Sequence, residues 1–407
     1  MTKALEGIRV LLHGRFWAGP IIGTQLGDFG AEVIRFEDPE VMDFIRDSPP
    51  FIKKGDKKIG LYYAYKDRNS KSMSLNLRKE GGKKAFKDLA KISDIIIDNH
   101  APGVMDNWGL GYETMKEINP RLIWVAVSTY GQSGPYSAEP GYDILAQGAS
   151  GLMDINGFPD GPPLRMPVGM ADTLGGLCGV KGTLIALFHR ERTGQGQMVD
   201  VSLFESATYP LQYAILQWTS LQEKYTRMGN KWGWGAYGPF KAKDGWLIIA
   251  TALDRQWYNL CEVMGKPELA KDPKFATVEG RSYYKHGEEA DNIIREWLKT
   301  RTVKETVGLL KKNRIPSAPV NDIPALVEDP QYNSRKNMFE VDYPGIGKLK
   351  IPGPVPHLSA TPGALETPAP QLGEHNDYIY RELLGYNDEK IGELEREGVI
   401  VSKQEYL

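Results

Sequence analysis

The 407-residue sequence has little of several features that would point to a function. Only two cysteines, Cys178 and Cys261, are present, too few for a disulfide framework and without the Cys/His spacing of a zinc site. The 50 basic and 52 acidic residues leave a net charge of -2, which provides no field to attract a polyanion. The N-terminal residues have no apolar signal core, and no run of 18 apolar residues stands out. We therefore expect a cytoplasmic protein with no nucleic-acid partner and no membrane association.

Motifs of several common enzyme classes are also missing. The turn after the first predicted strand, at residues 14–20, lacks the close glycine triplet of dinucleotide-binding folds. There is no Walker loop, and residues 148–151 lack the spacing of a hydrolase nucleophile elbow. The histidines occur singly, so a metal site would need tertiary contacts between distant segments. We expect neither hydride transfer nor serine hydrolysis, and no bound metal.

The order of apolar runs predicts an α/β fold. Residues 7–12 and 31–37 are typical of buried strands, and residues 20–29 between them are typical of a helix, which makes a βαβ unit. Alternating strands and helices favour a mainly parallel sheet covered on both faces. Further strands are expected at 72–77, 94–97, 122–127 and 197–203, and further helices at 79–89 and 174–189.

At about 150 residues per domain, this length predicts two or three domains, and we divide the chain into three parts. Residues 1–218 form the N-terminal part of a large domain, and residues 219–317 form a smaller α+β domain. Residues 318–407 hold a proline-rich extended connector and two terminal helices that return to the large domain. The elements expected after residue 219 are a strand at 246–250 and helices near 256–264, 287–298, 303–312, 377–384 and 388–397.

The most informative carboxylate is Asp172, which lies in the small-residue segment 167–176 ahead of a long apolar helix. In the simpler interpretation it caps that helix by accepting a hydrogen bond from a free backbone N–H. In the other, a carboxylate among small residues at a helix start is accessible to an electrophile, and nearby amides stabilise an oxyanion. On residue chemistry alone, the cap is favoured.

A second glycine-rich segment spans residues 229–238. Its four glycines make the backbone adaptable, and Trp232, Trp234 and Tyr237 offer large surfaces to a ligand. The alternative is a surface loop whose aromatic side chains pack on a neighbouring domain. Both interpretations fit the sequence equally well.

Several short segments together resemble the family III CoA-transferases. That family includes formyl-CoA, carnitine, bile-acid and benzylsuccinate CoA-transferases, and it shares its fold with α-methylacyl-CoA racemase. Each segment is weak alone, but their number, order and spacing make the resemblance specific from Leu5 to the C-terminus. They are 5–11 (LEGIRVL), 18–20 (AGP), 30–37 (GAEVIRFE), 99–103 (NHAPG), 131–135 (GQSGP), the Asp172 segment, 193–197 (TGQGQ) and 372–375 (LGEH).

The resemblance implies a fold, an assembly and a mechanism. The fold is a large Rossmann-like, CoA-binding domain and a smaller domain joined by long linkers, and two such chains interlock as a homodimer. The family's nucleophilic aspartate falls on Asp172, which attacks an acyl-CoA thioester and passes through an aspartyl anhydride and an aspartyl-CoA thioester. Coenzyme A thioester is then a substrate, and no permanently bound cofactor is needed.

The resemblance also assigns positions that contact CoA or shape the substrate site. Arg78 is the best cation for the CoA phosphates, whereas Asn107 and Asp38 stand where some members carry basic residues. Trp17 replaces a glutamine of formyl-CoA transferase, which favours a bulkier, less polar acceptor. The CoA-contact positions are Arg15, Phe16, Ala18, Leu75, Arg78, Asn99, Ala101, Val104 and Asn107, and the substrate-shaping positions are Trp17, Tyr142, Asp143, Trp232, Gly233, Trp234 and Gly235.

Alternatives remain for the substrates and for the reaction. Succinyl-CoA and acetyl-CoA are reasonable donors, and the acceptor acid is either aromatic or hydrophobic, like benzylsuccinate, or a carnitine-like quaternary ammonium acid held by cation–π attraction. The racemase branch uses a histidine where this chain has Tyr142, and a tyrosine with a pKa of about 10 is a poor proton shuttle. The remaining alternative is an acyl-CoA-binding subunit of a heteromeric transferase, although the presence of Asp172 argues against a catalytically inactive subunit.

Overall fold

The computed structural model describes residues 3–401 and divides into two compact units. The larger unit takes the described residues up to Met153, then Arg165–Lys224, and those from Ser334 onward. The smaller unit takes Asp154–Leu164 and Tyr225–Asn333. It thus begins at Tyr225 rather than at residue 219, ends at Asn333 rather than at 317, and includes a short segment from earlier in the chain.

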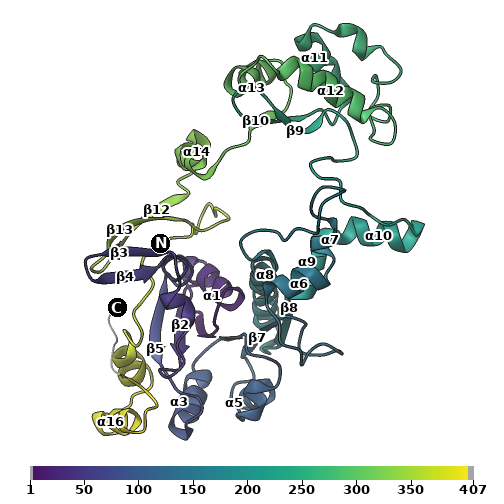
Figure 1. Ribbon diagram of the computed structural model, residues 1–407. Coiled ribbons are helices and arrows are strands. Elements are labelled where there is room, and N and C mark those ends of the chain that lie inside the picture. Colours follow the sequence, from purple (N-terminus) through teal and green to yellow (C-terminus); the bar gives the residue numbers. More distant parts are fainter. Residues whose placement is uncertain (1–2, 402–407) are drawn as a thin grey trace. The chain divides into compact units, whose positions relative to one another are not determined.

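The larger unit is built on a six-stranded parallel sheet in the order β5-β2-β1-β6-β7-β8 (Figure 1). Taken in chain order, these strands are arranged 3-2-1-4-5-6, the order of the Rossmann fold. The sequence-based prediction of a largely parallel α/β sheet is therefore confirmed. The strands are β1 (Arg9–His13), β2 (Glu32–Glu37), β5 (Ser70–Ser74), β6 (Ile95–Asp98), β7 (Ile123–Ser128) and β8 (Met198–Ser202).

One face of this sheet carries a core to which the end of the chain contributes. Apolar side chains of the strands pack against helices α3 (Glu80–Lys91) and α5 (Tyr112–Ile118). The C-terminal π-helix Tyr378–Leu383 and helix α16 (Asp388–Arg396) add Ile379, Tyr380 and Leu394 to the same cluster. The last part of the chain thus completes the larger unit, because these side chains would otherwise be exposed to water.

Helices α1 (Ala18–Asp28) and α8 (Met170–Thr193) also pack on the sheet, α1 against β1 and α8 against β7. The two helices contact each other. Close approach of these helices requires glycine in α8. A Cβ atom at Gly176 or Gly179 would lie only 2.6 Å or 2.3 Å from the side chains of Ile21 and Ile22, respectively. This contact anchors the N-terminal turn of α8 beside the β1–α1 loop.

Among the described residues, α8 alone is long and apolar enough to cross a membrane by length and composition. This differs from the expectation that no such stretch exists. Helices that pack in protein cores meet the same criterion, and only one third of the apolar window of α8 is buried within the chain.

Two β-hairpins in the larger unit were not expected from the sequence. They are β3 (Phe51–Lys54) with β4 (Lys57–Gly60), and β12 (Met338–Tyr343) with β13 (Gly347–Pro352). Side chains from both hairpin regions meet in one small apolar cluster, which an analysis of local periodicity does not detect. The remaining helices of this unit are Phe44–Asp47, α2 (Leu61–Lys66), α4 (Val104–Asn107), α6 (Asp143–Ala149), α7 (Leu152–Ile155, which runs into the smaller unit), α9 (Leu203–Thr208), Tyr209–Leu211 and α10 (Gln212–Leu221).

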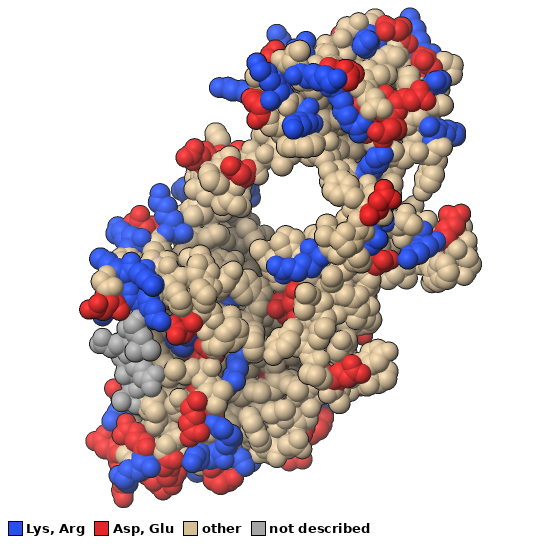
Figure 2. Space-filling model, in the orientation of Figure 1, with Lys and Arg blue, Asp and Glu red and all other residues tan. Residues whose placement is uncertain are grey.

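The smaller unit has its own core around a three-stranded antiparallel sheet in the order β11-β10-β9. The predicted strand at 246–250 and helices at 287–298 and 303–312 are confirmed with their boundaries. In Figure 2, basic and acidic side chains are interspersed over this unit, as expected for a chain of balanced charge. Its elements are β9 (Tyr237–Lys241), β10 (Trp246–Ala250), α11 (Asp254–Met264), Pro267–Ala270, α12 (Gly287–Leu298), α13 (Val303–Lys312), β11 (Ser317–Pro319), α14 (Ile323–Glu328) and α15 (Pro330–Ser334, which extends one residue into the larger unit).

Candidate active site

A cavity of about 500 Å³ opens at the carboxyl ends of β6 and β7 in the larger unit. This is where ligands bind in open parallel sheets, next to the point at which the strand order reverses. Its walls bring together eight residues that the sequence analysis singled out, from four separate segments of the chain. They are Phe16, Trp17, Ala18, Asn99, Ala101, Tyr142, Asp143 and Asp172.

The N-terminus of α8 is capped by Asp143 and not by Asp172. One carboxylate oxygen of Asp143 accepts hydrogen bonds from the backbone N–H groups of Ala171 (2.7 Å) and Asp172 (3.1 Å). Its other oxygen accepts from Gln147 Nε2 at 2.7 Å. The helix begins at Met170, so Asp172 lies inside its first turn and makes no capping bond. The simpler interpretation of Asp172 is therefore wrong, because a neighbouring carboxylate already occupies the free amides.

The Asp172 carboxylate is left without a hydrogen-bond donor among the described residues and lies partly buried in the cavity wall. Burial, and then the negative charge of Asp143, raise the pKa of Asp172 to about 7, although the positive charge of Lys66 opposes this. A carboxylate that is poorly solvated and has a raised pKa is a stronger nucleophile than one in water. The site therefore has a reactive group poised near neutral pH.

The backbone ahead of α8 is strained beside this carboxylate. Val168 and Gly169 both have positive φ angles, of 61° and 62°. Such an angle is a genuine outlier for a β-branched residue, and strain of this kind is concentrated at functional sites. A Cβ atom on Gly169 would lie between 3.7 and 3.9 Å from Trp17, Asp172 and Asp143, so the glycine keeps the space between these side chains open.

Replacing Asp143 with asparagine is expected to shift the acid limb of the pH–rate profile to lower pH. If ionised Asp172 is the reactive form, the rate rises with pH up to a pKa of about 7. Removing the Asp143 charge removes one of the two causes that raise this pKa, so Asp172 ionises at lower pH. The measurement is kcat/KM from about pH 5 to 9. Glu139→Gln removes another carboxylate from the same cavity and serves as control. An unchanged acid limb in Asp143→Asn would show that the two carboxylates are not coupled.

The β1–α1 loop is held by Asn99 and by a buried charge network. The Asn99 side chain accepts from Arg15 N–H at 2.9 Å and donates to the Arg15 carbonyl at 2.7 Å. Asp43 accepts from Phe16 N–H at 3.2 Å, and it is itself paired with the fully buried Arg35 at 2.7 Å. The Asn99 amide is thus used to position the loop, which presents Phe16, Trp17 and Ala18 to the cavity.

Other predicted CoA-contact residues lie outside the cavity wall. Arg78 is paired with Asp38 (2.6 Å) and Glu40 (2.9 Å), so it reaches a phosphate only by exchanging these partners. Leu75 is buried in the core on one face of the sheet. Arg15, Val104 and Asn107 are also outside the residues that line this cavity. Their roles in CoA binding stay predictions.

The tryptophan-containing loop belongs to the smaller unit. Trp232 is largely exposed, whereas the ring of Trp234 packs edge-on against Tyr237 at 5.6 Å. Gly233 has a positive φ of 54°, and a Cβ atom on Gly235 would lie 2.5 Å from the Gly287 carbonyl oxygen. Turn geometry and close packing therefore account for these two glycines without a ligand.

The sequence analysis did not single out three ionisable residues of the cavity wall, Arg165, Glu139 and His100. Arg165 is exposed and has no ion-pair partner in the part of the chain that the structure describes. It is the only cation between residues 160 and 180, a signal that could have been noticed beside Asp172. The segment that carries it is held by Gln147, whose side chain bonds the backbone of Met166.

Comparison with known proteins agrees with this site and fold. The profile of CoA-transferase family III matches residues 5–376. The chain is 35% identical to the succinyl-CoA–L-malate CoA-transferase beta subunit of Chloroflexus aurantiacus, over 98% of both chains. It is 33% identical to succinyl-CoA:glutarate CoA-transferase of Homo sapiens, over 98% of this chain and 90% of that protein. A CaiB/BaiF family protein from Brucella suis superposes with a TM-score of 0.83 and 32% identity, covering 94% of this chain and all of that one. The chain therefore belongs to CoA-transferase family III and is a CoA-transferase.

Proposed function

We propose that this enzyme transfers CoA from succinyl-CoA to a small dicarboxylic acid, with Asp172 as the nucleophile. The observation that carries this proposal is the Asp172 carboxylate, in a cavity that also contains the cation Arg165, neither of which has a side-chain partner in the described part of the chain. The names of the similar enzymes support the same donor and acceptors such as malate and glutarate.

The reaction needs only exchange of acyl partners at the Asp172 carboxylate. Attack on the donor thioester carbonyl breaks its C–S bond and gives an aspartyl–acyl anhydride and CoA thiolate. The thiolate attacks the Asp172 carbonyl, releases the donor acid and leaves an aspartyl-CoA thioester. The acceptor carboxylate then repeats the two steps in reverse, forming its own anhydride and taking CoA from the thiolate. Asp172 ends as a free carboxylate, so no proton or redox equivalent is consumed.

Arg165 provides the physical reason for a dicarboxylic substrate. One carboxylate of such an acid becomes the thioester, while the other keeps its charge and is stabilised by a cationic partner. Within residues 3–401, Arg165 is the only lysine or arginine lining the cavity, alongside the acidic Glu139, Asp143 and Asp172. A quaternary ammonium acid would bring a second positive charge next to Arg165, so a small dicarboxylate fits this wall better than a carnitine-like acceptor.

Substituting Arg165 with glutamine is expected to lower kcat/KM for dicarboxylic acceptors by roughly 10- to 100-fold. A decrease of this size corresponds to the loss of one charge-assisted hydrogen bond. Arg165→Lys should recover part of this loss because it restores the charge without the guanidinium fork. The assay follows new CoA thioesters formed from succinyl-CoA with malate, glutarate, mesaconate and a monocarboxylic acid of similar size.

Arg192→Gln, at the far end of α8, is the matched control for that assay. Equal losses for dicarboxylic and monocarboxylic acceptors in Arg165→Gln would contradict the assigned role. The function itself would be wrong if the wild-type enzyme formed no new thioester from succinyl-CoA with any of the dicarboxylic acids.

We further propose that the enzyme acts as a homodimer or together with a related chain. In the larger unit, Leu177, Leu184 and Phe188 of α8 line an apolar groove of about 620 Å³ with Phe29 and Leu358. A continuous apolar surface of this kind is typical of a subunit interface. A similar protein named as a beta subunit supports pairing with a related chain. Sedimentation of the purified chain, alone and with candidate partners, tests the assembly.

A further inference from the structure

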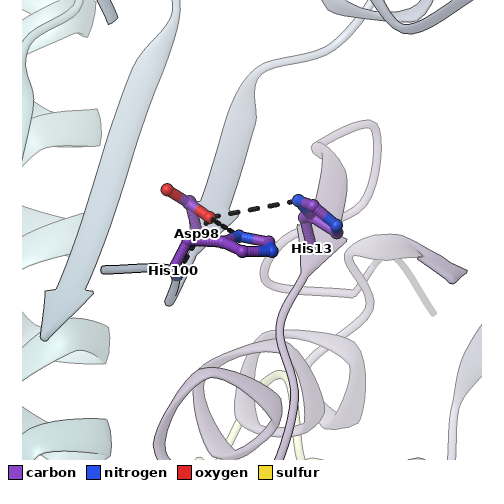
Figure 3. A group of neighbouring side chains, drawn as sticks. All are labelled: His13, Asp98 and His100. Atoms are coloured by element: carbon purple, nitrogen blue, oxygen red, sulfur yellow. Dashed lines mark hydrogen bonds and ion pairs between the residues drawn. The ribbon is translucent and has the colours of Figure 1, made fainter. Parts of the chain in front are cut away.

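Two histidines and an aspartate from two segments of the chain meet at the point where the strand order of the large sheet reverses (Figure 3). His13 ends β1, and Asp98 ends β6 at the paired position of the register. His100 follows two residues later, and its Nδ1 lies 2.6 Å from the Asp98 carboxylate. The two imidazole rings are 4.1 Å apart between their centroids. The tertiary contacts that isolated histidines would need for a metal site are thus present.

One ring nitrogen of His13, the buried Nδ1, is unsatisfied within the described part of the chain. The His13 side chain is only 6% exposed, and it stacks on Phe36 at 4.4 Å. The carboxylate oxygen Asp98 Oδ1 is 4.0 Å from His13 Nδ1, beyond hydrogen-bond distance. Buried polar atoms are normally satisfied, and an exception indicates a missing ligand, water or ion.

We propose that His13, Asp98 and His100 bind one divalent transition-metal ion of the Zn²⁺ type. Two imidazoles and a carboxylate are a preferred ligand set for this class of ion. The three ligand atoms lie within 4.8 Å of one another. Ligands of a tetrahedral zinc ion are about 3.4 Å apart, so small rotations of these side chains close the difference. Binding of the ion through His100 Nδ1 requires the tautomer that carries the ring proton on Nε2.

Both ends of the cluster are accessible from solvent-filled cavities. Asp98 lines a small cavity of about 240 Å³, and His100 lines the cavity that contains Asp172. An ion can therefore enter, and a water molecule can complete its coordination. Asn99, between two of the proposed ligands, holds the β1–α1 loop through Arg15. The bound ion would tie this loop to the end of β6 without taking part in the transfer of CoA.

The test is metal binding by the full chain after removal of any affinity tag and treatment with a chelator. We expect roughly one zinc per chain by elemental analysis and visible d–d absorption when Co²⁺ is added. Zn²⁺ should also raise the melting temperature, because it binds only the folded cluster. His13→Leu and His100→Phe should each weaken binding at least tenfold, since even the loss of an outer partner of a metal ligand costs about 10- to 100-fold.

His189→Phe, which removes an exposed histidine from α8, is the matched control and should bind like the wild type. If His13→Leu does not fold, the less buried His100→Phe decides the result. Failure of the wild-type chain to bind Zn²⁺ or Co²⁺, or equal binding by His100→Phe and the wild type, would overturn the proposal.

Discussion

Replacing Asp172 with alanine or asparagine is expected to reduce CoA transfer by at least about 10³-fold, the scale of losing a covalent nucleophile. The carboxylate has no hydrogen-bond donor among the described residues and lies in the cavity wall, so it is free to attack a bound thioester. The measurement is kcat with succinyl-CoA and a dicarboxylic acceptor. In the wild type, incubation with donor and hydroxylamine should leave a hydroxamate on the peptide that contains Asp172.

Glu139→Gln is the control, because it removes a carboxylate from the same cavity and should keep transfer within a few-fold of the wild type. The hydroxamate should be lost in Asp172→Ala and retained in Glu139→Gln. An Asp172→Ala protein that melts like the wild type and transfers CoA at the same rate would show that the nucleophile lies elsewhere.

The same Asp172→Asn substitution is expected to stabilise the fold at pH 8. The pKa of Asp172 rises from 3.8 to about 7 on folding, mainly through burial. The folded state therefore holds this proton more tightly than the unfolded state, and stability falls as pH rises from about 4 to 7. At about 1.4 kcal/mol per pKa unit, ionisation of Asp172 lowers the free energy of unfolding at pH 8 by up to about 4 kcal/mol. The loss is smaller where solvent reaches the carboxylate. Asparagine carries no charge and avoids this cost.

The measurement is the free energy of unfolding by urea at pH 5 and pH 8. Asp172→Asn should exceed the wild type by more at pH 8 than at pH 5, since the penalty is fully present only above the raised pKa. Glu139→Gln should stay within about 0.5 kcal/mol of the wild type at both values. An Asp172→Asn protein no more stable than the wild type at pH 8 would contradict the cause assigned to the raised pKa. Loss of activity with a gain in stability is the trade-off expected of a strained active site.

The sequence by itself determined the main elements of both units. Strands at the centre of a sheet are apolar throughout, and amphipathic helices repeat with their own period, so β10, α12 and α13 could be located closely from residues 246–250, 287–298 and 303–312. The two hairpins were not predicted because each has few apolar side chains. These side chains pack together in one small cluster that forms only in the folded chain. Ordered motifs also identified the family and drew attention to Asp172 before any contact was known.

Only the tertiary structure decided what each charged group does. Asp143 and Asp172 lie 29 residues apart, and which of them caps α8 depends on the packing of α6 beside it. Likewise, Arg78 is bound by Asp38 and Glu40, whereas Arg165, at the cavity, has no ion-pair partner among residues 3–401. His13 and His100 meet because β1 and β6 are neighbours in the sheet. Local sequence sets backbone preferences, but charge pairing and burial depend on residues brought together from distant segments, and these decide the pKa values and free side chains of the site.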